Sequence, residues 1–541
     1  MRFNINKNTT FNSSFMRFLF GFVLLASILT ACSTSVEEEV VDLLNSKKLS
    51  TKEKIELCLQ DEYVSVLRLN ETQKEWLRNL YKDRNYKALW IKDSTYTTEG
   101  EELKFVLDRS MWLGIPTNRI HFAVNKEKNI IIEELMLTAR SAVVLQDLKF
   151  GMIEDTIAKY KPAHPVDRKI FDQFTKNKDV VNYTYFMMEN SCLDTNYRFM
   201  AKHLYSYCSS YPMDEKEFKI KPMKEDSIAA IRETKNALES KGYLKKEATE
   251  EEFNDVLKTF QEHNGLKPDG KIGKYTVRAL NESTYTKVLR AGLTLDKLRR
   301  KEKYPEKFIQ INLPEYLLRL VVKDSLKSIH HIVIGKETNT TPQLKSRIYE
   351  VVVYPYWNVP YSIMSKEILP AAKNNVNYFA RNNYKIYRKD VEIDPHSVNW
   401  KKIKENSFPY KVIQQPGPKN SLGIIKFEFH NKYSVYVHDS PQKSLFKTDV
   451  RSYSHGCMRC ERPVDLGKLL LDYDSVGRKG NALIGDSLDS LLTIGENFPI
   501  RLLKPVPIFV EYQTVSADKD RMIFHIDIYK RDEEYLKIMK E

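Results

Sequence analysis

The chain has 541 residues, a formal net charge of +14 and an ordinary globular composition, with 42% hydrophobic and 29% charged residues. Its lysines and arginines are mixed with acidic residues along the whole length and form no long basic block, which argues against nucleic acid as a partner. Six cysteines are too few for a disulfide scaffold, and at ~150 residues per domain the length predicts three or four domains.

The N-terminal region contains one long apolar run, from Phe18 to Ala31, preceded by Arg17. Fourteen residues do not span a bilayer, which needs about 20, but they suit the core of a signal peptide. The run ends in Leu29-Thr30-Ala31-Cys32, which resembles a bacterial lipobox. We therefore predict a signal peptide over residues 1–31 and a lipid on Cys32 that anchors the protein to a membrane. The expected location is the periplasmic cell envelope, at the outer membrane.

The following segment, residues 32–60, stays polar and predicts a tether. Residues 61–225 have a helical character, with long mixed apolar stretches, and predict a helical scaffold domain whose Trp90 is a core residue. Cys192 and Cys208 are close enough in sequence to pair in an oxidising compartment. Without Cys32, five cysteines remain in the expected mature chain, and this odd number fits one reactive thiol: Cys58, Cys192, Cys208, Cys457 and Cys460.

Residues 226–285 carry the signals of a small three-helix domain. Thr249 followed by Glu252 is a capping box that opens a helix, and apolar residues then fall on one stripe as far as Phe260. Asn264-Gly265 offers a left-handed cap that ends the helix. A second short helix is expected over 275–280. The combined pattern resembles the peptidoglycan-binding domain of the PGB-1 type, which implies glycan binding or, in a reduced copy, a structural spacer.

From about residue 304, β-branched runs predict a mainly-β domain that extends to residue 505, with a C-terminal extension over 506–541. Residues 362 to about 403 are richer in helix formers and predict a helical capping insertion. The fold class expected for the chain is multidomain α+β. The clearest strand segments are Phe308–Leu313, Tyr316–Val322, Ile329–Ile334 and Ile424–Phe429.

A cysteine near two histidines and an arginine is the main candidate for chemistry, in the run Ser454-His455-Gly456-Cys457-Met458-Arg459. A cysteine acts as a nucleophile through its thiolate, which needs a neighbouring base or a positive field. Upstream, residues 432–439 alternate with period two, so that Tyr436 and His438 share one face of an expected strand, opposite two valines. An isolated Cys and His are more often packing residues, but a polar-aromatic strand face predicts a reactive site.

This pattern, with His438 separated from Ser454 by residues 439–453, resembles the active-site signature of the L,D-transpeptidases, the YkuD-type cysteine enzymes of bacterial cell-wall synthesis. Trp357-Asn358-Val359-Pro360 follows in the order of the same family, and the segment 81–90 resembles the scaffold region of its large members. The resemblance covers most of the expected mature chain and is strongest between residues 412 and 466.

The resemblance implies acyl transfer from a peptidoglycan stem peptide, with Cys457 as the nucleophile and His438 as the proton acceptor and donor. Backbone amides around Gly456 and Cys457, with His455 or Tyr436, would stabilise the oxyanion. Asp439 or a backbone carbonyl would orient the imidazole, and Arg459 would bind a substrate carboxylate or hold the loop.

The implied partners are stem peptides and glycan, with carbapenem-type compounds as inhibitors. No cofactor or metal is expected, because His263, His330 and His331 lack companion ligands at a convincing spacing.

Three other interpretations remain. Cys457-Met458-Arg459-Cys460 is formally a C-x-x-C motif, which raises redox catalysis, although the βαβ setting of a thioredoxin is absent. The favoured interpretation of Cys460 is a buried substitute for an aliphatic residue. The same thioester passed to water would make the protein an L,D-carboxypeptidase, and a decayed site would leave a non-catalytic lipoprotein that binds peptidoglycan.

Overall fold

The computed structural model describes residues 40–45, 48–121, 129–154, 157–176, 183–189, 195–475 and 485–541. The predicted signal peptide, Cys32 and Cys192 lie outside these residues. The chain forms two compact units, and each is built from segments that are not continuous in sequence. Unit 1 comprises residues 1–215, 284–300 and 533–541, and unit 2 comprises residues 216–283 and 301–532. Among the described residues, no helix combines the length and apolarity needed to cross a membrane.

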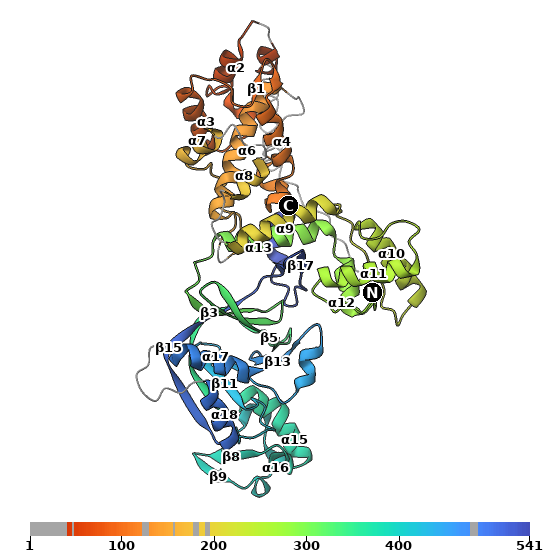
Figure 1. The fold of residues 1–541 in the computed structure, drawn as a ribbon, viewed down its shortest axis with the longest axis vertical. Coiled ribbons are helices and arrows are strands. Elements are labelled where there is room, and N and C mark those ends of the chain that lie inside the picture. The colour runs from red at the N-terminus through yellow and green to blue at the C-terminus, as the bar shows by residue number, and fades with distance from the viewer. Residues whose placement is uncertain are drawn as a thin grey trace, which may run out of the picture. The chain divides into compact units, whose positions relative to one another are not determined.

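Unit 1 is helical, as predicted for the scaffold (Figure 1). Its long central helix α6 (Ile130–Phe150) is buried along most of its length. Two segments far along the chain join it, α13 (Thr284–Arg299) and α19 (Glu533–Lys540). Its remaining elements are α2 (Thr51–Cys58), η1 (Val64–Leu67), α3 (Glu71–Asp83), β1 (Ile91–Lys92), β2 (Thr95–Tyr96), α4 (Thr98–Asp108), η2 (Ser110–Leu113), α5 (Thr117–Ile120), α7 (Arg168–Lys176), α8 (Tyr183–Glu189) and α9 (Thr195–Ser210).

The segment predicted as a tether contributes to this unit before residue 60. Ser50 caps α2 in a capping box with Glu53, and Ile55 and Cys58 on this helix are buried. Although the segment is polar overall, it contains one short amphipathic helix, which packs into the fold. Trp90 is buried, in agreement with its expected place in the core.

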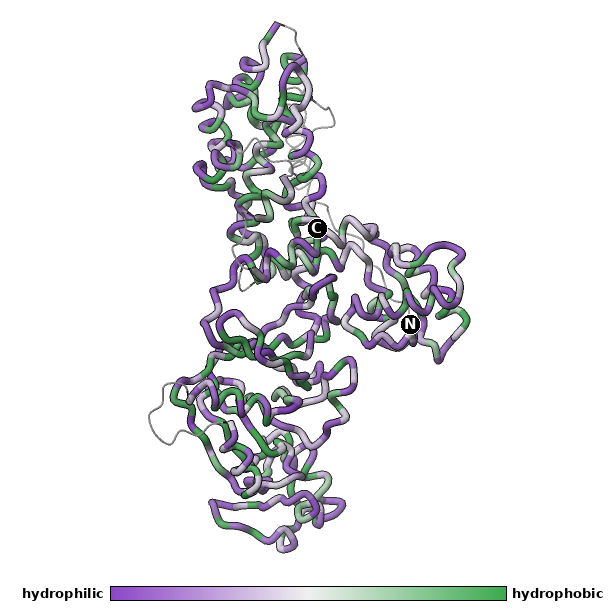
Figure 2. Tube along the Cα trace, in the orientation of Figure 1, coloured by the Kyte–Doolittle hydropathy of each residue, from purple (hydrophilic) through white to green (hydrophobic). Residues whose placement is uncertain are grey.

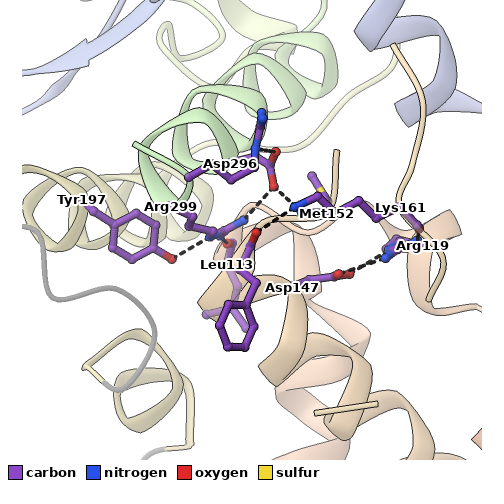
Figure 3. Close-up of polar contacts among 10 residues, drawn as sticks. Leu113, Arg119, Asp147, Met152, Lys161, Tyr197, Asp296 and Arg299 are labelled. Atoms are coloured by element: carbon purple, nitrogen blue, oxygen red, sulfur yellow. Dashed lines mark hydrogen bonds and ion pairs between the residues drawn. The ribbon is translucent and has the colours of Figure 1, made fainter. Parts of the chain in front are cut away.

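Buried ion pairs link the segments of unit 1 (Figure 3). Arg119 donates two hydrogen bonds to Asp147, at 2.7 and 2.9 Å, and both side chains are almost fully buried. On α13, Asp296 accepts from the Met152 amide at 2.6 Å, and Arg299 donates to the Leu113 carbonyl at 2.8 Å. Because an unpaired buried charge costs about 3–5 kcal/mol, this network fixes α13 within the helical body.

The first part of unit 2 is the three-helix domain expected over 226–285, built from α10 (Ser227–Ser240), α11 (Glu250–His263) and α12 (Lys274–Asn281). The helix α11 starts at the predicted capping box of Thr249 and ends at Asn264, and Gly265 follows with a positive φ of 64°. Its buried stripe includes Phe253 and Phe260, so the sequence prediction of this helix is confirmed.

The second part is mainly β, in agreement with the expected fold class. A nine-stranded sheet has the order β13-β5-β14-β12-β11-β6-β15-β3-β4, and the additional pairing of β4 with β5 closes it on itself. The strands are β3 (Lys307–Asn312), β4 (Leu317–Val322), β5 (Ser325–Gly335), β6 (Leu344–Val353), β11 (Ile425–Phe429), β12 (Val437–His438), β13 (Ser452–Ser454), β14 (Met458–Cys460) and β15 (Phe498–Glu511).

One continuous apolar core stabilises this sheet, and it includes residues of α17 (Pro463–Ser475) and α18 (Gly485–Ile494). Close approach of α17 to the sheet explains Gly467, because a Cβ there would contact Leu488 on α18 and lie near Ile425 and Val351. Figure 2 shows the apolar stretches along the strands of this domain and polar stretches along its outer loops. A hairpin of β16 (Val515–Ala517) and β17 (Met522–Phe524) follows the sheet.

The capping insertion has a core of its own, formed by Trp357, Phe379, Ile386, Trp400 and other apolar residues between positions 357 and 422. Besides the expected helical segments, it contains a four-stranded sheet of order β7-β10-β8-β9. Its elements are β7 (Trp357–Asn358), α14 (Tyr361–Ile363), the π-helical η3 (Met364–Ile368), α15 (Leu369–Asn374), α16 (Tyr378–Arg381), β8 (Tyr384–Arg388), β9 (Val391–Ile393), η4 (Pro395–Ser397), η5 (Trp400–Lys402), η6 (Glu405–Ser407) and β10 (Lys411–Gln414). We refer to residues 357–422 as the cap.

Candidate active site

Two short parallel strands bring the candidate residues together. β12 pairs with β14 so that His438 lies beside Arg459 and Val437 lies beside Met458. Val437 and Met458 are fully buried in the core of the sheet. Since side chains alternate along a strand, His438 and Arg459 share the opposite face, next to the cap.

The strand predicted over residues 432–439 is shorter than expected. Asn431 accepts from the amides of Tyr433 and Val435 and donates to the Val435 carbonyl, and Ser434 has a φ of 54°. This side-chain-stabilised turn replaces the first half of the strand. The two valines still share the buried face as predicted, because Val435 joins the core together with Val437 of β12.

Cys457 and Tyr436 are the residues that directly precede the paired positions of β14 and β12. The Tyr436 hydroxyl lies close enough to the Cys457 thiol and to the Trp357 side chain of the cap for these groups to shift its pKa. The rings of Tyr436 and His438 meet edge to face, with centroids 5.6 Å apart. Lys426 on β11 lies 4.0 Å from the centroid of the Tyr436 ring. The structure thus gathers a thiol, an imidazole, a phenol and an ammonium group on one face of the sheet.

Cys460 lies on the other face of β14. Its side chain is fully buried within the apolar core of the sheet, whereas Cys457 is partly exposed. Three residues apart on one strand, the two thiols point in opposite directions. This geometry argues against a redox pair and agrees with the interpretation of Cys460 as a packing residue.

The turn before Cys457 depends on Gly456. Its φ of 117° favours glycine, and its amide donates to Ser454 Oγ at 3.1 Å. Ser454 Oγ in turn donates to the Cys457 carbonyl at 2.6 Å. The Gly456 carbonyl accepts from Thr341 Oγ1 at 2.9 Å. The turn is therefore held by side-chain hydroxyls on both sides.

His438 is neutral over most of the pH range. Burial and the positive charge of Arg459 lower the pKa of His438 to about 3, although the backbones of Asp439 and Leu422 act in the opposite direction. Its Nδ1 atom is buried and makes no hydrogen bond of normal geometry with the described residues. A neutral imidazole retains a lone pair that can accept a proton.

Cys457 is a thiol rather than a thiolate at neutral pH. Burial raises the pKa of the Cys457 thiol, while hydrogen bonds from Tyr436 and the charges of Lys426 and Arg459 offset part of this rise. The resting pair is therefore a neutral thiol and a neutral imidazole. A neutral pair of this kind becomes nucleophilic only when a base removes the thiol proton, whereas a pair resting as thiolate and imidazolium would not need this step.

The Asp439 carboxylate does not turn towards the imidazole. It accepts from the Ile424 amide at 3.1 Å and pairs with Lys443. Gly423 packs so closely that a side chain there would collide with this carboxylate. Of the two orienting groups expected for His438, the Asp439 side chain is therefore engaged with other partners.

The two remaining candidates point to neighbouring loops. Arg459 donates to Gln442 Oε1 at 2.8 Å and stays partly exposed. His455 Nε2 lies 2.7 Å from Glu367 Oε1, on the π-helical turn of the cap. Among the residues that the structure describes, no group of three or more His, Cys, Asp or Glu side chains could hold a metal ion.

Sequence reasoning missed Glu367 and Lys426 at this site, and it gave no role to Thr341 and Trp357, although both lie in segments that follow the order of the family. Lys426 carried a usable signal, because it alternates with Ile425 and Phe427 on a predicted strand and pairs with His438 across β11 and β12. The others contact the site only through folding of distant segments.

Comparisons with known families match three segments of the chain. The family model described as L,D-transpeptidase catalytic domain (YkuD) matches residues 306–476. A model described as "Putative peptidoglycan binding domain" matches residues 227–280, and one described as Scaffold domain matches residues 75–185. The chain therefore carries these three domains.

Matches to individual proteins cover only part of the chain. A Haemophilus influenzae protein named "Putative L,D-transpeptidase" is 32% identical over 227 residues, which cover 41% of this chain and 44% of the relative. The match thus spans less than half the length of that protein. The crystal structure of an L,D-transpeptidase (Yku) from Stackebrandtia nassauensis covers 55% of this chain and 95% of its own, with 13% identity and a TM-score of 0.19. At this TM-score the likeness adds nothing to the fold described above.

Proposed function

We propose that the protein is a cysteine-dependent peptidoglycan L,D-transpeptidase that forms 3-3 cross-links between stem peptides. The observation that carries this proposal is the pairing of β12 with β14, which brings Cys457 to Tyr436 and leaves His438, whose ring meets that of Tyr436, on the same sheet face. The catalytic and peptidoglycan-binding domains support the same substrate class.

In the first half-reaction, neutral His438 accepts the Cys457 proton while the sulfur attacks the carbonyl carbon of the third stem residue. A C–S bond forms, the amide C–N bond to the terminal D-alanine breaks, and the imidazolium returns its proton to the leaving amine. The low pKa of His438 makes it a strong proton donor once it is protonated. The product is a thioester on Cys457 and free D-alanine.

In the second half-reaction, the side-chain amine of a neighbouring stem attacks the thioester. The new C–N bond forms as the C–S bond breaks, and the amine proton passes through His438 to the departing sulfur. If the acceptor residue is diaminopimelate at position three, the result is a 3-3 cross-link.

Charge that develops on the carbonyl oxygen needs hydrogen-bond donors, each worth roughly 3–4 kcal/mol in other enzymes. Because the Gly456 amide is occupied by Ser454, we assign this role to the Cys457 amide and the Tyr436 hydroxyl. Burial and the adjacent thiol raise the pKa of Tyr436, so this hydroxyl keeps its proton. Arg459 is assigned to a stem carboxylate.

Two alternatives share the same residues. Water in place of the acceptor amine would give L,D-carboxypeptidase activity through the same thioester. A protein that binds peptidoglycan without catalysis would keep the fold but leave Cys457 unacylated. The close contact of Cys457 with Tyr436 favours an active site.

The location is proposed from the sequence alone. A lipid on Cys32 would tether the protein to a membrane, and the outer membrane facing the periplasm places it against its substrate. The peptidoglycan-binding domain at residues 227–280 would add affinity for the glycan.

The test is incubation of sacculi with the protein, followed by mass spectrometry of the released muropeptides. Cross-linked products should appear with the parent and with Cys460→Ala, a matched thiol on the opposite strand face, but not with Cys457→Ala. Shortened stems without cross-links would establish the carboxypeptidase instead. A carbapenem should add once to the parent, on Cys457, and a folded parent that takes up no carbapenem would support the non-catalytic alternative.

A further inference from the structure

The turn that presents Cys457 is held by residues far away in the sequence. Thr341 is fully buried, and its hydroxyl donates to the Gly456 carbonyl at 2.9 Å while accepting from the Gly335 amide at 2.9 Å. One hydroxyl therefore fixes the segment after β5 to the residue next to the nucleophile. Neither bond can be made by an apolar side chain of the same shape.

The segment 525–532, which we name the C-terminal strap, fixes Thr341 in turn. The Tyr529 hydroxyl donates to the Gly335 carbonyl at 2.6 Å. The oxygen of this hydroxyl also accepts from the Thr341 amide at 3.2 Å. Arg531 donates to the Thr341 carbonyl at 2.9 Å and stacks its guanidinium over the rings of Tyr512 and Tyr529. The main chain around Thr341 is thus held on both its amide and its carbonyl side.

The other end of the strap is attached to the peptidoglycan-binding domain. Arg278 on α12 donates to the Asp527 carbonyl at 2.7 Å. The Asp527 carboxylate accepts from the Arg531 amide at 3.0 Å and from the Tyr512 hydroxyl, and that hydroxyl accepts from the Tyr529 amide at 2.8 Å. Gly265 packs against His525 so closely that a Cβ would lie 2.8 Å from its ring.

We propose that the C-terminal strap is a positioning element that holds the Gly456–Cys457 turn through Tyr529, Arg531 and Thr341 and ties it to the peptidoglycan-binding domain. The residues act through the turn rather than on the substrate. The domain that binds the wall and the residue that reacts with it are then connected by consecutive hydrogen bonds, so that movement of one shifts the other. This inference rests on the proposed nucleophilic role of Cys457 but requires no transpeptidation.

The test measures alkylation of Cys457 by iodoacetamide as a function of pH in the full-length protein. Alkylation forms an S–C bond and releases iodide, so it reports thiolate supply and access without any peptidoglycan. Trypsin cleaves after Arg451 and Arg459, which leaves Cys457 on the peptide 452–459 and Cys460 on a separate peptide. Mass spectrometry can therefore follow the nucleophile alone.

Tyr529→Phe and Thr341→Val should change the alkylation rate by about tenfold or more and displace its pH profile, because a small misplacement of a reacting group has large effects. Thr341→Ser, which keeps the hydroxyl, should restore the parent profile. The matched control is Tyr304→Phe, which removes hydrogen bonds to Glu511 from another half-buried tyrosine of the same unit. Parent-like profiles in both variants, or an equal change in the control, would overturn the proposal.

The link to the peptidoglycan-binding domain is tested by Arg278→Gln. This variant should change the alkylation rate of Cys457 in the same direction as Tyr529→Phe does, by roughly two- to threefold or more. Arg232→Gln, exposed on α10 of the same domain, should not. An unaltered profile in Arg278→Gln would remove the domain from the proposal. Failure of the proposed function is distinguishable, because it would leave these profiles intact while no cross-links form.

Discussion

Oε1 of Glu367 lies 2.7 Å from Nε2 of His455, and this contact joins the cap to the loop that carries the nucleophile. Glu367 belongs to a π-helical turn, an irregularity that often marks functional sites. Both side chains are partly exposed, so the pair adds little stability. The contact holds one cap helix against His455, which lies two positions before Cys457.

Glu367→Gln should loosen this contact without unfolding the protein. We expect faster hydrogen exchange of the cap amides over 361–374 and an altered rate of Cys457 acylation, with stability changed by less than about 1 kcal/mol. Glu392→Gln is the control, because Glu392 forms a similarly exposed pair with Lys385 elsewhere in the cap. Equal exchange in the two variants would show that the His455 contact does not restrain the cap.

Cys457 directly precedes β14 and Cys460 ends it, and the opposite orientation of their thiols predicts opposite mutant phenotypes. Cys457→Ala should abolish thioester formation, whereas Cys460→Ala should retain it and cost about 1 kcal/mol of stability through lost packing. Intact-protein mass spectrometry after carbapenem treatment distinguishes them. Loss of the adduct in Cys460→Ala, with retention in Cys457→Ala, would reverse the assigned roles.

Local sequence patterns predicted the elements that depend on local physics. The capping box at Thr249 and the left-handed Gly265 bound α11 as expected, and the β-branched runs became β3, β4, β5 and β11. Capping and alternation are decided by neighbouring residues, so a sequence displays them directly.

The contacts that assemble the site are of another kind. Thr341 meets Gly456, 115 positions later, and Tyr529 meets Gly335, 194 positions earlier. Such partners leave no periodic signal, because their pairing depends on how the sheet closes. The same applies to α13, which joins unit 1 after the chain has passed through the peptidoglycan-binding domain. The family resemblance supplied roles for Cys457 and His438; it extended to the tail that contains Tyr529, but gave the strap no role.

The pH dependence of Cys457 follows from its charge state. Because the pKa of the thiol is raised above its usual value of 9.0, the thiolate fraction should increase with pH up to and beyond pH 9. Iodoacetamide alkylation should therefore rise about tenfold per pH unit between pH 6 and 8. A rate that is already maximal at pH 6 would indicate a resting thiolate and imidazolium, contrary to the neutral pair described here.

Membrane attachment is expected to depend on Cys32. Cys32→Ala should leave an unlipidated precursor, because lipidation requires the sulfur of this residue in the Leu29-Thr30-Ala31-Cys32 motif. Fractionation and intact-mass measurement of the mature protein check this. Processing and membrane fractionation identical to those of the parent would refute the lipobox.

Acid stability of the sheet should depend on His438. Its pKa is about 3 in the folded protein against an ordinary value of 6.5, so the unfolded chain binds an extra proton between these pH values. The contribution of neutral His438 to the free energy of unfolding is fully present above pH 6.5. It is lost as the pH falls towards 3, by on the order of a few kcal/mol.

His438→Gln has no group to titrate at this position and should lose less stability than the parent over the same interval. Hydrogen exchange of the buried strand amides at pH 7, 5.5 and 4 reports this local opening. His430→Gln, at an exposed histidine, should follow the parent. Parallel acid sensitivity in the parent and His438→Gln would mean that the folded and unfolded states bind a proton at this imidazole equally well. The lowered pKa of His438, and the strong proton donation inferred from it, would then have to be abandoned together.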